Sequence, residues 1–184
     1  MEFIERIKKR AAEKNCQIVL PESYDTRITA AALQIAQEGF ARILLLSDGE
    51  SSIPDEEQLR KAGIEILDYK HSDDFPVMAE KLYELRKKKG MTREGADSML
   101  RDPLYYGAMM AHEGMVDGMV AGACHSTGDT LRPALQIVKT ARGIKTVSAY
   151  FLMVVPDCRY GCNGVFLFAD SGLVEFPTEE QLVD

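Results

Sequence analysis

One segment of the sequence, Ala123–Pro133 (ACHSTGDTLRP), carries most of the side chains that could do chemistry. It follows an apolar run, Val116–Ala121, which predicts a buried strand, and it leads into a helix predicted over Thr130–Thr140. A strand that ends at the start of a helix leaves backbone N–H groups without partners at the positive end of the helix dipole. Such groups bind phosphate oxygens. The junction therefore predicts a phosphate site.

The side chains of this segment suit the same chemistry. Its small polar residues offer hydroxyl donors and close approach of the backbone: Ser126, Thr127, Gly128 and Thr130. Arg132 can hold a phosphate through two parallel N–H···O bonds. The alternative is that Asp129 or Thr130 only caps the helix, with Pro133 tolerated in its first turn. On that reading Arg132 is simply solvated.

The reactive residues outside this set give weaker predictions of function. Cys158 and Cys162, taken with His125, could suggest zinc, but the spacing is atypical and no second pair exists, so two reduced cysteines in a turn are expected instead. The sequence therefore predicts no metal site. A basic run, Arg86–Lys89, ends a predicted helix, where cations complement the helix dipole. The role of His125 stays open.

The elements that must position these residues alternate along the chain. Short apolar runs predict strands at Gln17–Leu20, Arg42–Ser47, Ile64–Leu67, Val116–Ala121, Thr146–Val155 and Val165–Asp170. Segments with helical periodicity predict helices at Phe3–Lys14, Ile28–Gln37, Asp55–Ala62, Phe75–Lys89, Thr92–Leu100, Pro103–His112 and Thr130–Thr140. The last two strands could pair as a hairpin. The alternation predicts an α/β fold of three layers, α/β/α, around a mostly parallel sheet.

Composition excludes several classes of function. The 184 residues are 46% hydrophobic, with 22 Lys and Arg against 29 Asp and Glu, a net charge of -7. Such a charge disfavours general attraction to nucleic acid or to an anionic membrane. No apolar run approaches the roughly 20 residues that span a bilayer, and the N-terminus lacks the apolar region of a signal peptide. We expect a cytoplasmic protein whose partners are small molecules, not nucleic acid or membrane.

The string GACHSTGDTLRPALQIVKT (Gly122–Thr140) resembles the signature of phosphate acetyltransferases, also called phosphotransacetylases. Four further segments fit the same family: VLPESYDTRI (Val19–Ile28), YELRKKKG (Tyr83–Gly90), VDGMVAGA (Val116–Ala123) and VPDCRYGCNGVFLFADSG (Val155–Gly172). The resemblance covers essentially the whole chain. It implies reversible transfer of an acetyl group between acetyl phosphate and coenzyme A, giving acetyl-CoA and inorganic phosphate without a metal or redox cofactor.

The resemblance also implies roles for individual residues. Arg86 is implied to contact the phosphate end of coenzyme A, where it acts by binding and orientation. Arg132 is implied to contact phosphate near the reacting acetyl phosphate and, with Ser126, to form the catalytic group, since preorganised donors stabilise charge in a transition state. The remaining substrate-binding residues are implied to be Thr127, Gly128, Asp129 and Thr130.

The sequence departs from the family at its end. Family members continue for nearly as far again and supply a serine–arginine pair and an aspartate that acts as base toward the coenzyme A thiol; no matching motif exists here. The capping box at Thr178–Gln181 predicts the start of a helix, but the sequence ends at Asp184, about one helical turn later. We therefore expect the front part of a longer protein, without a complete active site. The resemblance implies a first domain over residues 1–145, the start of a second over 146–184, and a homodimer in the full-length form.

Two other interpretations stay open. Phosphate butyryltransferase shares the acyl-phosphate chemistry and differs in its acyl pocket, which the sequence does not size. A non-catalytic α/β domain that binds a phosphate-bearing ligand or a partner subunit would also fit. A metal-dependent decarboxylating dehydrogenase is disfavoured, because no cluster of aspartates suits a divalent metal.

Overall fold

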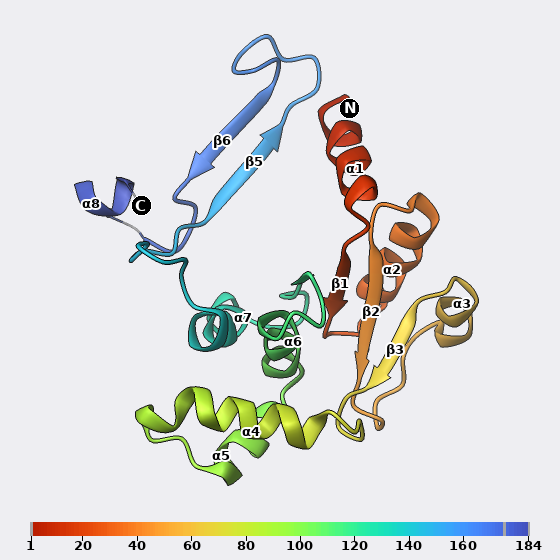
Figure 1. Cartoon of the computed structure of the whole chain (residues 1–184). Coiled ribbons are helices and arrows are strands. Elements are labelled where there is room, and N and C mark those ends of the chain that lie inside the picture. Colours follow the sequence, from red (N-terminus) through yellow and green to blue (C-terminus); the bar gives the residue numbers. More distant parts are fainter. Residues whose placement is uncertain (1, 175, 184) are drawn as a thin grey trace. The chain divides into compact units, whose positions relative to one another are not determined.

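Four short strands pair in parallel in the order β3–β2–β1–β4. The first three are labelled in Figure 1. The four strands are β1 (Gln17–Leu20), β2 (Arg42–Ser47), β3 (Glu65–Asp68) and β4 (Gly118–Met119). Strand β1 lies inside the sheet, since it pairs with β2 on one side and with β4 on the other. The loops after β1 and β4 therefore meet at the carboxyl edge of the sheet, where open α/β sheets bind ligands.

Helices cover both faces of this sheet. One face carries α4 (Phe75–Arg86), α5 (Arg93–Leu100) and α6 (Pro103–His112), and the other carries α2 (Thr26–Glu38) and α3 (Glu56–Lys61). Val19 and Leu44, which are paired in register, belong to the first core, and their neighbours Leu20 and Leu45 belong to the second. Successive strand residues face opposite sides, so these continuous apolar runs are what a sheet buried on both faces requires. The predicted α/β fold is confirmed.

The helix predicted at Thr130–Thr140 has different bounds. It begins three residues earlier as α7 (Thr127–Pro133) and continues as a π-helical segment, η2 (Ala134–Val138). Pro133 lies at the end of α7, not in the first turn as predicted. Proline has no N–H to donate to the carbonyl four residues back, and the wider turn that follows fits this loss. Ile137 is fully buried and anchors η2 in the core of the α4–α6 face.

Other predicted elements were too long, among them the strand predicted at Thr146–Val155, which is regular only over Tyr150–Val154. The strand predicted at Val116–Ala121 is regular only over Gly118–Met119, because the backbone turns away at Gly122, whose φ is +110°. The helix predicted to Lys89 ends as α4 at Arg86, and a 3₁₀ turn, η1 (Lys87–Lys89), follows. Gly90 then closes it in the left-handed conformation, as a C-cap glycine should. The N-terminal helix is α1 (Glu2–Lys14).

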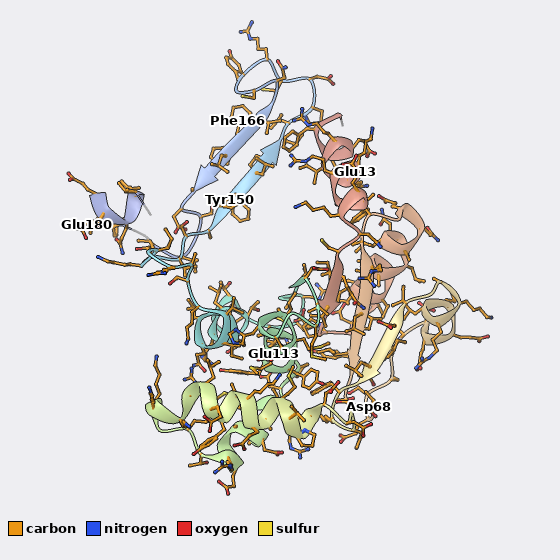
Figure 2. All side chains as sticks on the ribbon, in the orientation of Figure 1. Glu13, Asp68, Glu113, Tyr150, Phe166 and Glu180 are labelled. Carbon is orange, nitrogen blue, oxygen red and sulfur yellow. The ribbon has the colours of Figure 1, made fainter. Side chains whose placement is uncertain are left out.

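The predicted hairpin is also confirmed. Strands β5 (Tyr150–Val154) and β6 (Val165–Ala169) pair antiparallel, and the side chains of Tyr150 and Phe166 are labelled on them in Figure 2. The turn between the strands holds Cys158 and Cys162 as free thiols. The capping box forms as well: the Thr178 N–H donates to Gln181 Oε1 at 2.9 Å, and α8 (Glu179–Val183) follows.

The computed structural model describes residues 2–174 and 176–183. Contacts between residues divide the chain into two units, Lys8–Lys139 and a smaller one made of Met1–Ile7 with Thr140–Asp184. The domain boundary expected at residue 145 lies within the smaller unit, and residue 184 lies outside the described residues. Within the described ranges, no helix is both long and apolar enough to cross a membrane.

Candidate functional site

Ser126 and Asp129 form the N-terminus of α7. Ser126 is the N-cap, and its Oγ accepts the Asp129 N–H at 3.2 Å. In return the Ser126 hydroxyl donates to Asp129 Oδ2 at 2.6 Å, and the Thr130 hydroxyl donates to the Ser126 carbonyl at 3.1 Å. The expectation that Asp129 or Thr130 would cap this helix is therefore wrong. The cap lies earlier because the helix itself begins earlier, at Thr127.

Asp129 also links the cap to Arg132. The two side chains form an ion pair with 3.4 Å between Oδ1 and Nη1, and the Arg132 side chain is 58% exposed. The hydrogen bond from Ser126 and, less strongly, the charge of Arg132 hold the pKa of Asp129 below its usual value. Asp129 is thus an ionised orienting group. The guanidinium of Arg132, in the last turn of α7, remains exposed to a ligand.

Arg86 reaches the same helix from α4. Its Nη1 donates to the Gln136 carbonyl of η2 at 3.2 Å, and its Nε is buried without a partner among the described residues. The Tyr105 hydroxyl of α6 donates to Gln136 Oε1 at 3.2 Å. Burial raises the pKa of Tyr105, while Arg132 and Arg86 both act to lower it, so the two arginines lie within electrostatic range of one hydroxyl. The structure therefore brings these two predicted residues to one region.

The loop that leads into Ser126 is held by a residue that sequence reasoning missed. Glu22, directly after β1 and Pro21, is fully buried. Its Oε2 accepts the N–H groups of Gly122 and Ala123, and its Oε1 accepts the N–H of Cys124, each at 2.8 Å. The prediction that N–H groups throughout this junction are unpaired is therefore wrong at Ala123 and Cys124. The groups left for a ligand begin at the α7 N-terminus.

A second set of contacts fixes the outer side of the loop. Asp25 caps α2, and its carboxylate accepts from Arg27 Nε at 3.0 Å and Nη2 at 2.7 Å. Arg27 Nη2 also donates to the Ala123 carbonyl at 2.7 Å, and the Cys124 thiol donates to Asp25 Oδ2 at 3.0 Å. Hydrogen bonds from Arg27 and Cys124 hold the pKa of Asp25 well below its usual value. The segments after β1 and β4 thus support one another.

Sequence reasoning missed both Glu22 and Arg27, and only their place directly after a buried strand could have indicated their role. Glu22 and Arg27 lie after a strand whose neighbour in the sheet, β4, comes about one hundred residues later. Only the strand order places them beside the loop. Acidic and basic residues that follow two buried strands are candidates for such a contact, because parallel strands end at the same edge.

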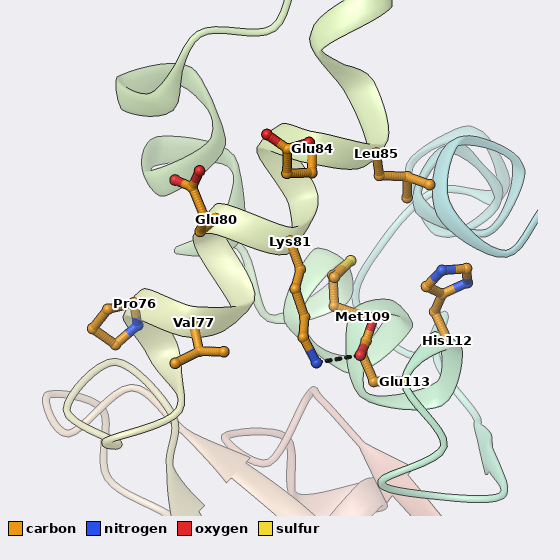
Figure 3. Close-up of a pocket in the computed structure, with 9 residues that line it drawn as sticks. All are labelled: Pro76, Val77, Glu80, Lys81, Glu84, Leu85, Met109, His112 and Glu113. Carbon is orange, nitrogen blue, oxygen red and sulfur yellow. Dashed lines mark hydrogen bonds and ion pairs between the residues drawn. The ribbon is translucent and has the colours of Figure 1, made fainter.

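An apolar groove lies elsewhere on the Lys8–Lys139 unit. A groove of about 620 Å³ between α4 and α6 is lined by apolar side chains such as Val77, Leu85 and Met109, with a Lys81–Glu113 ion pair beside them (Figure 3). None of the predicted site residues lines it. Within the described ranges, no three His, Cys, Asp or Glu side chains are grouped as a metal site would require. The polar contacts that could meet a substrate are concentrated at the β4–α7 junction.

Comparison with known proteins identifies the family. Among sequences, phosphate acetyltransferase of Acetivibrio thermocellus is 50% identical over 182 residues, 99% of this chain and 55% of that protein. The phosphate acetyltransferase of Clostridium acetobutylicum is 45% identical over 187 residues, 100% of this chain and 56% of that protein. The chain thus spans about half the length of these curated relatives.

Solved structures give the same result. A phosphotransacetylase from Streptococcus pyogenes superposes with a TM-score of 0.83 at 38% identity, over 98% of this chain and 54% of that one. EutD phosphotransacetylase from Staphylococcus aureus gives 0.82 at 31% identity, over 98% and 53%. The profile of the family described as phosphate acetyl/butaryl transferase matches residues 2–184. With fold, loop sequence and profile in agreement over nearly its whole length, the chain belongs to the phosphate acetyl/butaryl transferase family.

Proposed function

We propose that this chain supplies the N-terminal half of an enzyme that moves an acetyl group between acetyl phosphate and coenzyme A, with acetyl-CoA and inorganic phosphate on the other side of the reaction. The relatives that cover it are named phosphate acetyltransferase, which favours acetyl over butyryl as the group transferred. The observation that carries the proposal is the exposed Arg132 guanidinium, in the last turn of α7, a short helix whose N-terminus is fixed by Ser126 and Asp129.

Arg132 has the geometry of a phosphate contact. A guanidinium binds two phosphate oxygens at once, and its 3.4 Å pairing with Asp129 is loose enough to be exchanged for a ligand. We assign it the neutralisation of the phosphate that leaves when the thiol attacks. Ser126 holds the helix start, and the backbone N–H groups of Thr127 and Gly128, with the Thr127 hydroxyl, bind substrate oxygens around it. The Thr130 hydroxyl, which donates to the Ser126 carbonyl, would have to exchange that bond to bind substrate, and Asp129 orients Arg132.

Arg86 is assigned the phosphate end of coenzyme A. Its buried Nε lacks a partner among the described residues, and burying a charged donor without an acceptor is costly, so an anion at this place would satisfy it. The same guanidinium braces η2 through the Gln136 carbonyl. Arg86 therefore acts in binding and in holding the helix that carries Arg132.

The proposed substrates carry their own reactive groups: acetyl phosphate is an activated acyl donor, and coenzyme A supplies the thiol. We propose that no metal or redox cofactor takes part, that the full-length protein is a homodimer, and that it works in the cytoplasm. The resemblance of the motifs supports these assignments.

Thioester formation from acetyl phosphate and coenzyme A tests the proposal. It is measured for the 184-residue chain and for a chimera in which this chain precedes the C-terminal part of the Acetivibrio thermocellus enzyme that it does not cover. We expect turnover by the chimera, with acetyl phosphate preferred to butyryl phosphate. Coenzyme A binding without transfer of either acyl group would instead identify a non-catalytic binding domain and contradict the proposal.

A further inference from the structure

Gln136 of η2 is held by two side chains from different helices. Its backbone carbonyl accepts a hydrogen bond from Arg86 Nη1 at 3.2 Å, and its side-chain Oε1 accepts one from the Tyr105 hydroxyl, also at 3.2 Å. Arg86 is the last residue of α4, and Tyr105 lies on α6. Gln136 therefore connects the Tyr105 hydroxyl to the Arg86 guanidinium through a single residue.

The contact with η2 fixes the Arg86 guanidinium. Gln136 lies in the last turn of η2, where backbone carbonyls have no N–H partner within the helix and carry the negative end of its dipole, so a cation suits this place. A guanidinium is planar and rigid, and holding one of its nitrogens limits the directions in which its other N–H groups point. Nε of the same group is buried and has no partner within the described ranges. Arg86 is thus anchored at Nη1 and unsatisfied at Nε.

Tyr105 is suited to act as a fixed donor to Gln136. It is only 8% exposed and belongs to the core of the α4–α6 face, as does Ile137, the neighbour of Gln136 in the chain. Burial raises the pKa of Tyr105, so the hydroxyl keeps its proton at neutral pH. A packed ring has little freedom, and its hydroxyl therefore holds the Gln136 side chain in one place.

Arg132 has supports of its own. Asp129 pairs with Arg132, and Ser126 fixes Asp129 at the start of α7. Pro133, at the end of α7, is buried. Gln136 follows these residues in the chain, and it contacts Arg86 directly. A change at Tyr105 should therefore affect Arg86 more than Arg132.

We propose that Tyr105 and Gln136 are positioning residues for Arg86 in the binding of coenzyme A, an inference that rests on the proposed function. The Tyr105 hydroxyl holds the Gln136 side chain, the Gln136 carbonyl holds Nη1 of Arg86, and the N–H groups that remain on the guanidinium bind phosphate oxygens. Without the hydroxyl, Gln136 gains freedom, and the guanidinium is ordered only when the ligand binds. Ordering a flexible side chain during binding lowers affinity.

The size of the effect follows from the contact that is removed. The net contribution of one hydrogen bond between neutral groups corresponds to about a three- to tenfold change in an equilibrium constant. We expect loss of the Tyr105 hydroxyl to weaken coenzyme A binding by this factor. Loss of the Arg86 side chain should weaken it more, because a charged contact to phosphate is then removed.

The first test measures the dissociation constant of coenzyme A for the 184-residue chain and its variants. We expect Tyr105→Phe and Gln136→Met each to raise it about three- to tenfold, and the double variant to raise it no further than either alone, because both remove the same contact. The nucleotide end of coenzyme A without its thiol arm, 3′-phospho-ADP, should show the same ratios. Effects that add in the double variant, or no change in Tyr105→Phe, would overturn the inference.

Tyr106→Phe is the matched control. Tyr106 is the next residue of α6 and is fully buried, and its hydroxyl lies 3.1 Å from Ser72 Oγ, so this variant also loses one buried hydroxyl contact. Melting curves should show similar losses of stability in Tyr105→Phe and Tyr106→Phe, while only Tyr105→Phe weakens coenzyme A binding. Equal weakening by both would mean that the hydroxyl acts on the fold as a whole and not on Arg86.

The second test uses the chimera and separates the two substrates. We expect Tyr105→Phe to raise the KM for coenzyme A about three- to tenfold, and to change kcat and the KM for acetyl phosphate by less than about twofold. A rise of the same size in the KM for acetyl phosphate would place the effect at Arg132, and it would contradict a role through Arg86.

The outcomes distinguish this inference from the proposed function. A wild-type chimera that forms no thioester contradicts the proposed function, and the inference falls with it. A wild-type chimera that turns over while Tyr105→Phe keeps the wild-type KM for coenzyme A overturns the inference alone. An Arg86→Ala variant with unchanged affinity for coenzyme A would overturn the inference and the role assigned to Arg86, and it would leave the proposed reaction in place.

Discussion

Ser126 and Asp129 hold each other reciprocally: the Asp129 N–H donates to Ser126 Oγ at 3.2 Å, and the Ser126 hydroxyl donates to Asp129 Oδ2 at 2.6 Å. The start of α7 is therefore set before any ligand binds. Because Asp129 also pairs with Arg132, the cap and the guanidinium are linked through one carboxylate. Preorganised donors of this kind need little rearrangement during a reaction.

The cap can be tested through stability. Ser126→Ala removes the oxygen that accepts the Asp129 N–H, and loss of such a cap costs about 1 kcal/mol. We expect the free energy of unfolding, measured with denaturant, to fall by about that amount. Thr92→Ala is the matched control, since Thr92 caps α5 by accepting the Gly95 N–H at 3.0 Å. Both should lose similar stability, but only Ser126→Ala should weaken phosphate binding. Equal binding in the two variants would contradict a ligand site at this cap.

Arg132→Ala should separate function from stability. The side chain is exposed and its one ion pair is long, so we expect unfolding free energy to change by less than about 0.5 kcal/mol. Transfer by the chimera should fall about 100-fold or more, as when a preorganised charge is removed from a transition state. Arg60→Ala is the control, because that α3 side chain is 57% exposed and paired with Glu56. Comparable activity of both variants would remove Arg132 from the site.

Glu22 predicts how stability depends on pH. Its folded pKa lies below its ordinary value of 4.5, so its contribution is fully present above that value and is lost as the pH falls through the folded pKa. Glu22→Gln replaces one accepting oxygen with an NH2 group, so the N–H donors on that side of the loop lose their acceptor, at about 1–3 kcal/mol each. We expect a less stable protein at pH 7 whose stability falls less steeply below pH 4.5.

Denaturant unfolding across that pH range measures the effect. Glu50→Gln is the control, because the Glu50 side chain is 78% exposed and its contact with Lys70 is long. Parallel pH curves for wild type and Glu22→Gln would mean that folding does not lower the pKa of Glu22.

The exposed apolar residues of the β5–β6 hairpin lead us to expect that copies of the chain associate. Tyr150 and Phe151 on β5 are 66% and 60% exposed, and Leu167 and Phe168 on β6 are 64% and 55% exposed. Neighbouring residues of a strand face opposite sides, so both faces of the hairpin are apolar. Exposed apolar strands promote pairing between chains.

We therefore expect sedimentation to show concentration-dependent association, reduced in the double variant Phe151→Asn, Phe168→Asn. Val77→Asn serves as the control, because Val77 is 54% exposed but lies on α4. A monodisperse monomer at all concentrations would contradict this prediction.

Much of the fold could be predicted from the sequence, and the failures have physical causes. Continuous apolar runs such as Arg42–Ser47 mark strands buried on both faces, and this strand was predicted to the residue. The end of β4 was mispredicted, because hydrophobicity continues through Val120 and Ala121 while the backbone already turns toward Glu22. A local hydrophobic pattern carries no information about a hydrogen-bond partner that lies one hundred residues away in the sequence.

The candidate site shows the same limit. The motif correctly indicated a helix start beside Ser126, because helix termini are local features, but the helix begins three residues earlier than predicted, with Ser126 as its N-cap and Arg132 in its last turn. Glu22 and the orientation of His125 depend on the order of strands in the sheet, which no local signal carries. Sequence reasoning therefore missed the residues that support the site from a neighbouring strand.

The most direct measurement is a titration of the 184-residue chain with coenzyme A and with inorganic phosphate, followed by amide NMR. The account predicts that shift changes with phosphate are concentrated at Thr127–Arg132, and that coenzyme A also perturbs Arg86. Changes centred on the α4–α6 groove, or no changes at millimolar ligand, would contradict the claim that phosphate-bearing substrates meet this chain at the β4–α7 junction.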